Sequence, residues 1–324
     1  MVKRSLVKLS NNKKERLEKI LSISEYVKRQ DYSDKKLEGK NIALLFEKPS
    51  TRTRSAFEIA VKDLGGNTVF LDKEEIHLGY RESLEDTAKV LESYFDGVGF
   101  RGMRHEKVER LDQHTSIPVW NLLTDKFHPT QVLSDFFTIE EVFEKDLSDI
   151  KLAYIGNGIN NVLNSLIVGA AKTGMNMRIV TPEELRPDRK LMVKSRNIAR
   201  KQNSTLKCFS NVEKGLEEVD VVYTDVWVSM NDPKSEWDEM IDKLSPYSVD
   251  NEKMDLTSEN SVFMHCLPAL HDKETILADK ICERHGIECL EVSDNVFRSD
   301  SSIVFQQSEN KLHTLKSLLI DSFD

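Results

Sequence analysis

The sequence contains few cysteines, and their spacing excludes two common uses of this residue. The four are Cys208, Cys266, Cys282 and Cys289, and no two of them form a Cys-x-x-Cys pair. A small disulfide framework or a cysteine-based zinc site needs closer and more regular spacing. We therefore expect reduced thiols, a cytoplasmic location and no metal site.

Long apolar runs and an excess of positive charge are missing as well. No apolar segment approaches the ~20 residues that span a bilayer, and the basic residues 1–14 include no apolar stretch typical of a signal peptide. Acidic residues outnumber basic residues by 55 to 46, so the net charge is -9. We expect neither a nucleic acid nor a membrane as a partner, although a local basic pocket is compatible with this balance.

What the sequence does contain is an alternation of short apolar segments and amphipathic segments. This pattern predicts an α/β fold with two domains, each a mostly parallel sheet flanked by helices. We place the domains at residues 1–148 and 149–307, and we expect the C-terminal helix, about 308–324, to return to the first domain. The expected strands are 41–46, 69–71, 97–100, 117–120, 151–155, 177–181, 205–209, 219–224 and 261–265. The main expected helices of the first domain are 13–29, 51–64, 84–94, 106–113 and 130–144.

One junction between a strand and a helix has the composition of an anion site. Residues 46–54 read Phe-Glu-Lys-Pro-Ser-Thr-Arg-Thr-Arg. The start of a helix directs free backbone N–H groups and the positive end of the helix dipole at one point. Two hydroxyl groups and Arg52 add donors that suit phosphate oxygens. A capped helix with solvated arginines is the simpler interpretation, but two Thr-Arg pairs at the turn favour the anion site.

Residues 50–54, Ser-Thr-Arg-Thr-Arg, resemble the carbamoyl-phosphate signature of the aspartate/ornithine carbamoyltransferase family. Three further blocks follow in the order of that family: His-Pro-Thr-Gln at 128–131, Asp-Val-Trp-Val-Ser-Met at 225–230 and His-Cys-Leu-Pro at 265–268. The last block separates the ornithine enzymes of the family from the aspartate enzymes. The resemblance covers roughly residues 5–322. It implies transfer of a carbamoyl group from carbamoyl phosphate to the side-chain amine of ornithine, giving citrulline and phosphate without a cofactor.

The resemblance also implies which residues form the site. Carbamoyl transfer passes through a tetrahedral carbon whose oxygen gains negative charge and needs preorganised donors. Gln131 is expected to hold the carbamoyl NH2 group, and the expected catalytic residues are Arg101, His128, Cys266 and Arg298. The expected carbamoyl-phosphate site consists of Ser50, Thr51, Arg52, Thr53, His77, Arg101, His128, Gln131, Cys266, Leu267 and Arg298. The expected ornithine site consists of Asn161, Asp225, Ser229 and Met230.

Other features follow from the same resemblance. In the family, the loop around His77 reaches the active site of a neighbouring subunit, which implies a homotrimer or a multiple of trimers. The bond between Leu267 and Pro268 is expected to be cis. Two residues depart from the family pattern: Asn157, where Asp is frequent, and Asn231, where Gly is usual.

Three alternatives remain open. The turn Gly156-Asn157-Gly158 and the later Glu183 resemble the start of a dinucleotide site, which would indicate an NAD-dependent dehydrogenase, but the third glycine is replaced by Asn161. A carbamoyltransferase that uses a different amine is a closer alternative. A non-catalytic relative is disfavoured because the groups expected to bind carbamoyl phosphate are retained.

Overall fold

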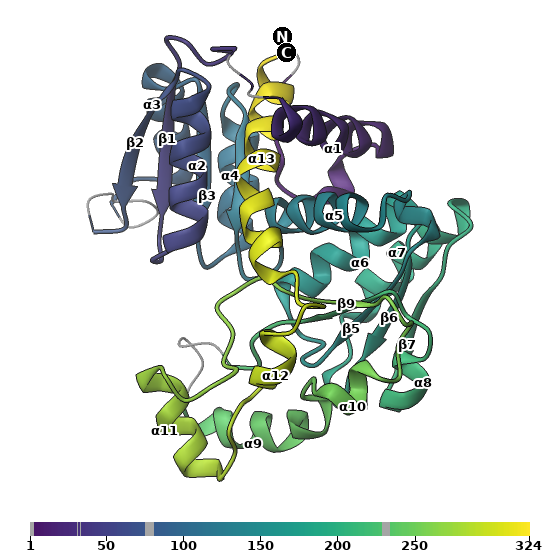
Figure 1. Cartoon of the computed structure of the whole chain (residues 1–324). Helices are drawn as coiled ribbons and strands as arrows, with labels where there is room; N and C mark the ends of the chain where they lie inside the picture. Colours follow the sequence, from purple (N-terminus) through teal and green to yellow (C-terminus); the bar gives the residue numbers. More distant parts are fainter. Residues whose placement is uncertain (1–2, 31, 33, 75–80, 229–233) are drawn as a thin grey trace. The chain divides into compact units, whose positions relative to one another are not determined.

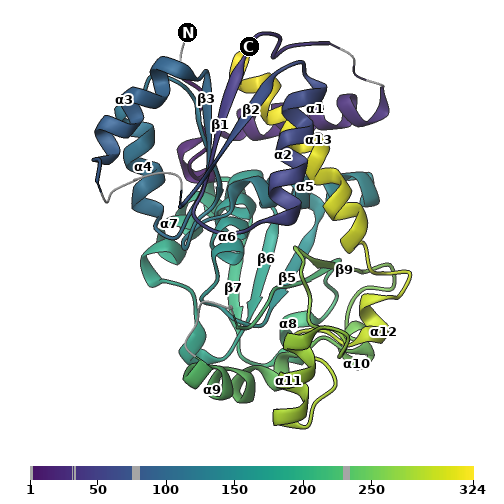
Figure 2. The same cartoon turned by 90° about the vertical axis from the view of Figure 1, so that its left-hand side faces the viewer.

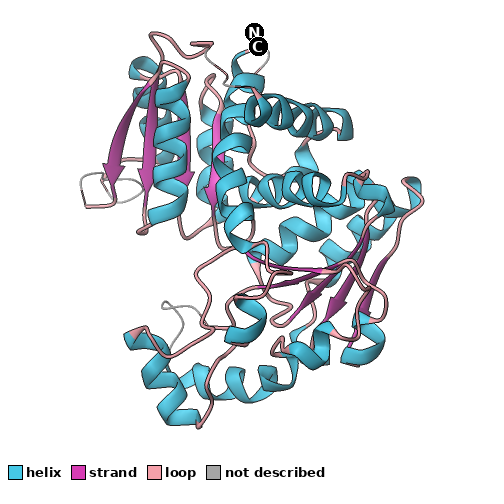
Figure 3. Cartoon of the chain, in the orientation of Figure 1, coloured by secondary structure: helices cyan, strands magenta, loops and turns pink. Residues whose placement is uncertain are grey.

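The computed structural model describes residues 3–30, 32, 34–74, 81–228 and 234–324. The chain forms two compact units. Unit 1 comprises Met1–Glu144 and Ser308–Asp324, and unit 2 comprises Lys145–Gln307. In each unit, helices cover a sheet of short strands (Figure 3).

Unit 1 is built on a four-stranded parallel sheet of order β2-β1-β3-β4 (Figure 1). The strands are β1 (Asn41–Phe46), β2 (Asn67–Asp72), β3 (Gly97–Arg101) and β4 (Val119–Leu123). The helices are α1 (Lys14–Arg29), α2 (Thr51–Asp63), α3 (Leu84–Tyr94), α4 (His105–His114), α5 (Pro129–Phe143) and most of α13 (Val304–Phe323). Figure 2 shows α3 and α4 on one face of this sheet and α2 and α13 on the other.

The sheet of unit 1 has a switch in strand order. The chain passes from β1 to β2 on one side and then crosses to β3 on the other side of β1. The carboxyl ends of β1 and β3 therefore lie next to each other, with Phe46 in register with Arg101. In open α/β sheets, ligands bind beyond the carboxyl ends of the strands at such a switch point.

Unit 2 repeats this solution with a five-stranded parallel sheet of order β7-β6-β5-β8-β9. The strands are β5 (Lys151–Ile155), β6 (Asn176–Val180), β7 (Leu206–Phe209), β8 (Val221–Thr224) and β9 (Val262–His265). The helices are α6 (Asn161–Thr173), α7 (Arg189–Lys201), α8 (Val212–Leu216), α9 (Lys234–Leu244), α10 (Asn251–Met254), α11 (Ile276–His285) and α12 (Asp294–Phe297). The switch point lies between β5 and β8.

The structure confirms the α/β class, the parallel sheets and the return of the C-terminal helix to the first unit. Several boundaries differ from the sequence prediction by a few residues, including those of β2, β8 and β9, and two further differences are as follows. The strand expected at 117–120 begins only at Val119, because Pro118 has no N–H group for the strand ladder. Helix α13 begins four residues before the expected position, at Val304. Among the described helices, none combines the length and the hydropathy needed to cross a bilayer.

Candidate functional site

The turn from β1 into α2 presents an open helix start. Ser50 lies at the N-cap position, but its side chain makes no capping hydrogen bond, and the first turn of α2 contains no acidic residue. Thr53 is buried, whereas Thr51 and Arg52 are exposed. This arrangement leaves hydroxyl and backbone N–H donors for an anion at the positive end of the helix.

The two arginines of the motif have different surroundings. Arg54 donates through Nε to Glu58 over 2.9 Å, and its guanidinium lies 3.4 Å from the centroid of the Phe70 ring. These contacts hold Arg54 against α2 and β2. Arg52 forms no ion pair with any residue that the structure describes, so it is the arginine of the pair that can serve the anion site.

Glu47 is a site residue that the sequence analysis missed. It follows β1 directly, and its N–H group donates to the carbonyl of Arg101 over 2.8 Å. Its carboxylate, with a side chain only 7% exposed, accepts from the N–H of Met103 over 2.9 Å and forms an ion pair with Lys107. A Cβ at position 102 would lie 2.5 Å from Glu47 Oε2, so only Gly102 fits. Glu47 therefore holds the loop that follows Arg101.

His128 lies at the start of α5 and is almost fully buried. Burial, followed by the positive charges of Lys311 and Arg101, lowers the pKa of His128 well below its ordinary value. At neutral pH its ring is therefore uncharged, with one nitrogen that donates and one that accepts. The charge of Arg101 therefore acts on His128, so these two residues of the expected site share one electrostatic neighbourhood.

Gln131 is buried in the first turn of α5, and both ends of its amide are bonded. Its Nε2 donates to Asp135 Oδ1 over 2.8 Å, and its Oε1 accepts from Lys311 Nζ over 2.8 Å. Lys311, on α13, is only 5% exposed and was missed in the sequence analysis. The sequence pattern could have indicated it, because Lys311 shares a helix face with the apolar residues Leu315 and Leu318. A lysine on a buried face needs a hydrogen-bond partner.

In unit 2, Asp225 follows β8 and is nearly buried. Its Oδ1 accepts from Cys266 Sγ over 3.0 Å, and its Oδ2 accepts from Asn160 Nδ2 over 2.8 Å. Asn160 also caps α6 by accepting from the N–H groups of Val162 and Leu163. The structure therefore gathers Asp225, Cys266 and the start of α6, where Asn161 lies, at the switch point of this sheet.

Two buried residues, His265 and Glu291, contact the loop that follows β9. The Leu267–Pro268 bond is cis, as expected, and Leu267 has a φ of 58°. His265 Nδ1 accepts from the N–H of Leu267 over 2.9 Å, and Nε2 lies 3.3 Å from Glu291 Oε1, with both side chains fully buried. Glu291 also accepts from the N–H of Leu270. His265 and Glu291 thus support the loop that presents Cys266 and Leu267.

Ligand atoms of Asp225, His265 and Cys266 lie within 4.8 Å of one another. These atoms are already engaged, since Asp225 accepts from Cys266 and His265 Nδ1 accepts from a backbone N–H group. A metal ion here would have to displace these bonds, so the absence of a metal from the reaction remains our prediction.

Arg298 has surroundings that the sequence analysis did not anticipate. Its side chain is 60% exposed and is paired with Asp294 over 2.8 Å and with Asp272 over 3.4 Å. These two ion pairs tie Arg298 to α12, where Asp294 lies, and to Asp272. His77, Ser229, Met230 and Asn231 lie outside the described residues.

The structure gives a role to Asn157, one of the two departures from the family pattern. Its Oδ1 accepts from the N–H of Ile159 over 2.9 Å, and its Nδ2 donates to the carbonyl of Trp227 over 3.3 Å. Because a carboxylate cannot donate, an Asp could not make the second bond. Asn157 therefore links the turn after β5 to the loop after β8.

The second glycine of the same turn does not leave space for a dinucleotide. A Cβ at Gly158 would lie 2.0 Å from the carbonyl oxygen of Leu185. In a dinucleotide site the second glycine lets the pyrophosphate approach the backbone. Here it accommodates the chain around Leu185, so the turn does not support the dehydrogenase alternative.

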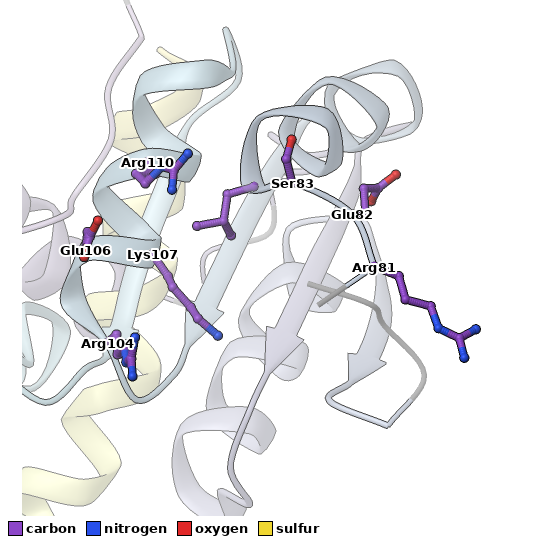
Figure 4. Close-up of a pocket in the computed structure, with 8 residues that line it drawn as sticks. Arg81, Glu82, Ser83, Arg104, Glu106, Lys107 and Arg110 are labelled. Atoms are coloured by element: carbon purple, nitrogen blue, oxygen red, sulfur yellow. The ribbon is translucent and has the colours of Figure 1, made fainter. Parts of the chain in front are cut away.

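A basic pocket of about 440 Å³ lies between the first turns of α3 and α4 (Figure 4). Its lining residues are Arg81, Glu82, Ser83, Leu84, Arg104, Glu106, Lys107 and Arg110. Figure 4 shows Lys107 reaching from α4 toward the strand ends, whereas Arg81 points away. Lys107 pairs with Glu47 of the turn between β1 and α2, so this excess of positive side chains adjoins the turn that holds the candidate anion site.

Comparison with known proteins agrees with this geometry. Residues 4–141 match the carbamoyl-P binding domain of aspartate/ornithine carbamoyltransferases, and residues 148–321 match their Asp/Orn binding domain. Ornithine carbamoyltransferases from Pediococcus pentosaceus and Staphylococcus aureus are each 44% identical over 321 residues, 98% of this chain and 96% of the relative. The solved ornithine carbamoyltransferase of Pyrococcus furiosus is 34% identical with a TM-score of 0.89 and covers 98% of this chain and 96% of its own. That of Thermus thermophilus is 34% identical with a TM-score of 0.83 and covers 99% of both chains. The chain belongs to the aspartate/ornithine carbamoyltransferase family.

Proposed function

We propose that this protein transfers the carbamoyl group of carbamoyl phosphate to the side-chain amine of L-ornithine, giving L-citrulline and phosphate as a step of arginine metabolism. The names of its relatives support ornithine as the acceptor. The carrying observation is the grouping of Arg101, neutral His128 and Gln131 at the carboxyl edge of the sheet where α2 begins. Such a set of donors suits an anion that also carries a carbonyl group.

We assign carbamoyl-phosphate binding to residues 1–148 with the terminal helix at 308–324, and ornithine binding to residues 149–307. The phosphate is held by the start of α2 and by arginines, through Ser50, Thr51, Arg52, Thr53 and Arg101. The carbamoyl group is held by His128, Gln131, Cys266 and Leu267. His77 and Arg298 complete this assignment. The buried ammonium of Lys311 supplies a further positive charge beside Gln131.

The reaction needs no cofactor, because the carbamoyl carbon is already activated by its bond to phosphate. The amine nitrogen attacks this carbon with its lone pair, and the C–O bond to phosphate then breaks. Phosphate leaves with the bonding electrons, and the proton that the nitrogen loses balances its charge, so that the product is hydrogen phosphate. In the tetrahedral intermediate the former carbonyl oxygen carries negative charge, which Arg101, the N–H of neutral His128 and Thr53 stabilise as donors.

The amino-acid end of ornithine has both an α-carboxylate and an α-ammonium group. We propose that Asn161 binds the carboxylate and that Asp225 binds the ammonium, together with Ser229 and Met230. Asp225 supports this role because it is nearly buried and held in place by Asn160 and Cys266. A charged group fixed in this way binds an ammonium without first losing rotational freedom.

We further propose that the protein acts as a homotrimer or a multiple of trimers in the cytoplasm. The trimer follows from the family loop around His77. The cytoplasm is supported by the four cysteines, all of which are free thiols, since a reducing compartment preserves them.

The test is an assay of citrulline formation from carbamoyl phosphate with ornithine, lysine, putrescine and aspartate as acceptors. Ornithine should give the highest kcat/KM. Faster carbamoylation of another amine would replace ornithine as the acceptor, and no carbamoylation of any acceptor would refute the catalytic role itself.

A further inference from the structure

We propose that Asp135 is a positioning residue that lets the site distinguish a carbamoyl phosphate from an acyl phosphate without an amino group. It does so by fixing which end of the Gln131 amide faces the substrate. The proposal rests on the proposed function, since it concerns the recognition of carbamoyl phosphate. Asp135 lies four residues after Gln131, so both side chains project from the same face of α5.

The contacts around Gln131 form a short buried chain. Asp135 Oδ1 accepts from Gln131 Nε2 over 2.8 Å, and Gln131 Oε1 accepts from Lys311 Nζ over 2.8 Å. Asp135 is fully buried, and Gln131 and Lys311 are at most 5% exposed. Because these groups are shielded from water, a polar contact with the wrong donor or acceptor would cost much free energy.

The two neighbours of Gln131 agree on one orientation of its amide. An ionised Asp can only accept hydrogen bonds, and a Lys ammonium can only donate them. If the amide turned by 180°, its oxygen would face the carboxylate of Asp135 and its NH2 group would face the ammonium of Lys311. Both contacts would become repulsive, so Asp135 and Lys311 together exclude the turned form.

This orientation matters for the substrate. The Gln131 carbonyl oxygen has a second lone pair, which can accept from the NH2 group of a carbamoyl phosphate. An acyl phosphate with a methyl group in this place, such as acetyl phosphate, has no N–H to donate. With Gln131 free to turn, its own NH2 group would face the substrate's NH2 group in part of the molecules, and the preference for the carbamoyl compound would fall.

The experiment compares two stable dianions that differ only at this group: phosphonoacetamide, which carries NH2, and acetonylphosphonate, which carries CH3. Their Kd values are measured by calorimetry for the unmodified protein and for Asp135→Ala. We expect the variant to bind phosphonoacetamide about tenfold more weakly, the loss of about one hydrogen bond, and to bind acetonylphosphonate within about twofold of the original Kd. A change in charge alone acts equally on both dianions and cancels in the ratio of Kd values.

Thr138→Val is the matched control. Thr138 is fully buried on the same helix and accepts from Asn310 Nδ2 over 3.0 Å, but neither residue is bonded to Gln131. This variant should lose stability and keep the ratio of Kd values. An unchanged ratio in Asp135→Ala, or an equal loss of affinity for both dianions, would overturn the proposal.

Asp135→Asn keeps the volume and tests the proposal if Asp135→Ala does not fold. As in Asp135→Ala, only Lys311 then enforces one orientation of Gln131, because the Asn amide can donate as well as accept; its oxygen can still accept from Gln131 Nε2, so the effect should be smaller. The ratio should fall in the same direction by about threefold, and an unchanged ratio would overturn the proposal. Citrulline formation by the unmodified protein is measured first, so that failure of the proposed function is seen separately from failure of this inference.

Discussion

At the scale of single residues, the effects of replacing Arg101 and Arg54 on kcat/KM separate an arginine of the proposed site from an arginine that is engaged elsewhere. Replacing Arg101 with Leu should remove at least ~3 kcal/mol of transition-state stabilisation, because in the proposed site it deletes a charged donor to the phosphate and the developing oxyanion. The measurement is kcat/KM for carbamoyl phosphate. Arg54→Leu is the control, because Arg54 is paired with Glu58 and lies on the Phe70 ring, and it should keep near-normal kcat/KM. Near-normal turnover in Arg101→Leu would refute its assignment.

A substitution at Asp225 tests whether the two substrates are bound by separate residues. Asp225→Asn should raise the KM for ornithine by about tenfold or more, the loss of a charge-assisted hydrogen bond to the ammonium. The KM for carbamoyl phosphate should change far less. Asp220→Asn is the matched control: it lies at the opposite end of β8, where Oδ2 accepts from the N–H of Lys151. Equal rises in both KM values would contradict the role of Asp225.

The lowered pKa of His128 makes the free energy of unfolding depend on pH. Burial, Lys311 and Arg101 hold its folded-state pKa below the unfolded value of about 6.5. In this pH range His128 binds a proton in the unfolded chain but not in the folded chain. The free energy of unfolding therefore falls as the pH decreases from about 6.5 toward the folded-state pKa. For one group, this slope is at most about 1.4 kcal/mol per pH unit. In urea denaturation between about pH 7 and 5.5, His128→Asn should have a shallower slope than the unmodified protein, and an identical slope would contradict the assignment.

At the scale of elements, α13 joins the buried core of unit 1 through a mixed face. Leu315, Leu318 and Leu319 are buried beside the polar residues Asn310 and Lys311. Asn310 donates to Thr138 on α5 over 3.0 Å and Lys311 donates to Gln131. The apolar residues provide stability, and the polar residues fix the position of the helix along α5, so that Lys311 arrives beside Gln131.

Leu318→Ala should therefore destabilise unit 1 by about 2–5 kcal/mol, the usual cost of a cavity left by a fully buried Leu. Trp120 reports this directly, because its Nε1 donates to Ser322 on α13 over 2.9 Å. The measurement is Trp120 fluorescence during urea denaturation, with Trp227 and Trp237 replaced by Phe. Leu312→Ala, at a half-buried position of the same helix, should cost less, and equal costs would argue against the packing described.

At the scale of the whole molecule, the reaction requires ornithine in a form that the solution rarely supplies. Its side-chain ammonium resembles that of Lys, with a pKa of about 10.4, and only the free amine is a nucleophile. Because the pKa of His128 lies well below 6.5, His128 is too weak a base to take a proton from the ammonium near neutral pH. We expect kcat/KM for ornithine to rise about tenfold per pH unit well below the amine pKa.

This profile is measured between about pH 6 and 9 with saturating carbamoyl phosphate. Phosphate release with carbamoyl phosphate alone, followed over the same range, serves as the control for substrate decay. A flat profile would mean that the ammonium binds productively and passes its proton to a base on the protein.

The sequence by itself determined the fold class, the order of the elements and the motifs. Strands separated by helices leave few arrangements other than parallel sheets, and the composition of the turn at 50–54 predicts an anion site. His128 and Gln131 could be named because they lie in one local block, whereas Arg101 was named because the resemblance to the family implies it. Local chemistry can be read from local sequence, since strand ends and helix starts impose it within a few residues.

Only the tertiary structure decided which groups are free and which are engaged. The sequence assigned Arg52 to the anion site but could not say what engages Arg54, whose guanidinium lies over the ring of Phe70 on another strand. Lys311 lies 180 positions from Gln131 along the chain and still meets it. Asn157 meets Trp227 across the switch point of unit 2. These partners are brought together by sheet order and helix packing, so no window of the sequence contains them.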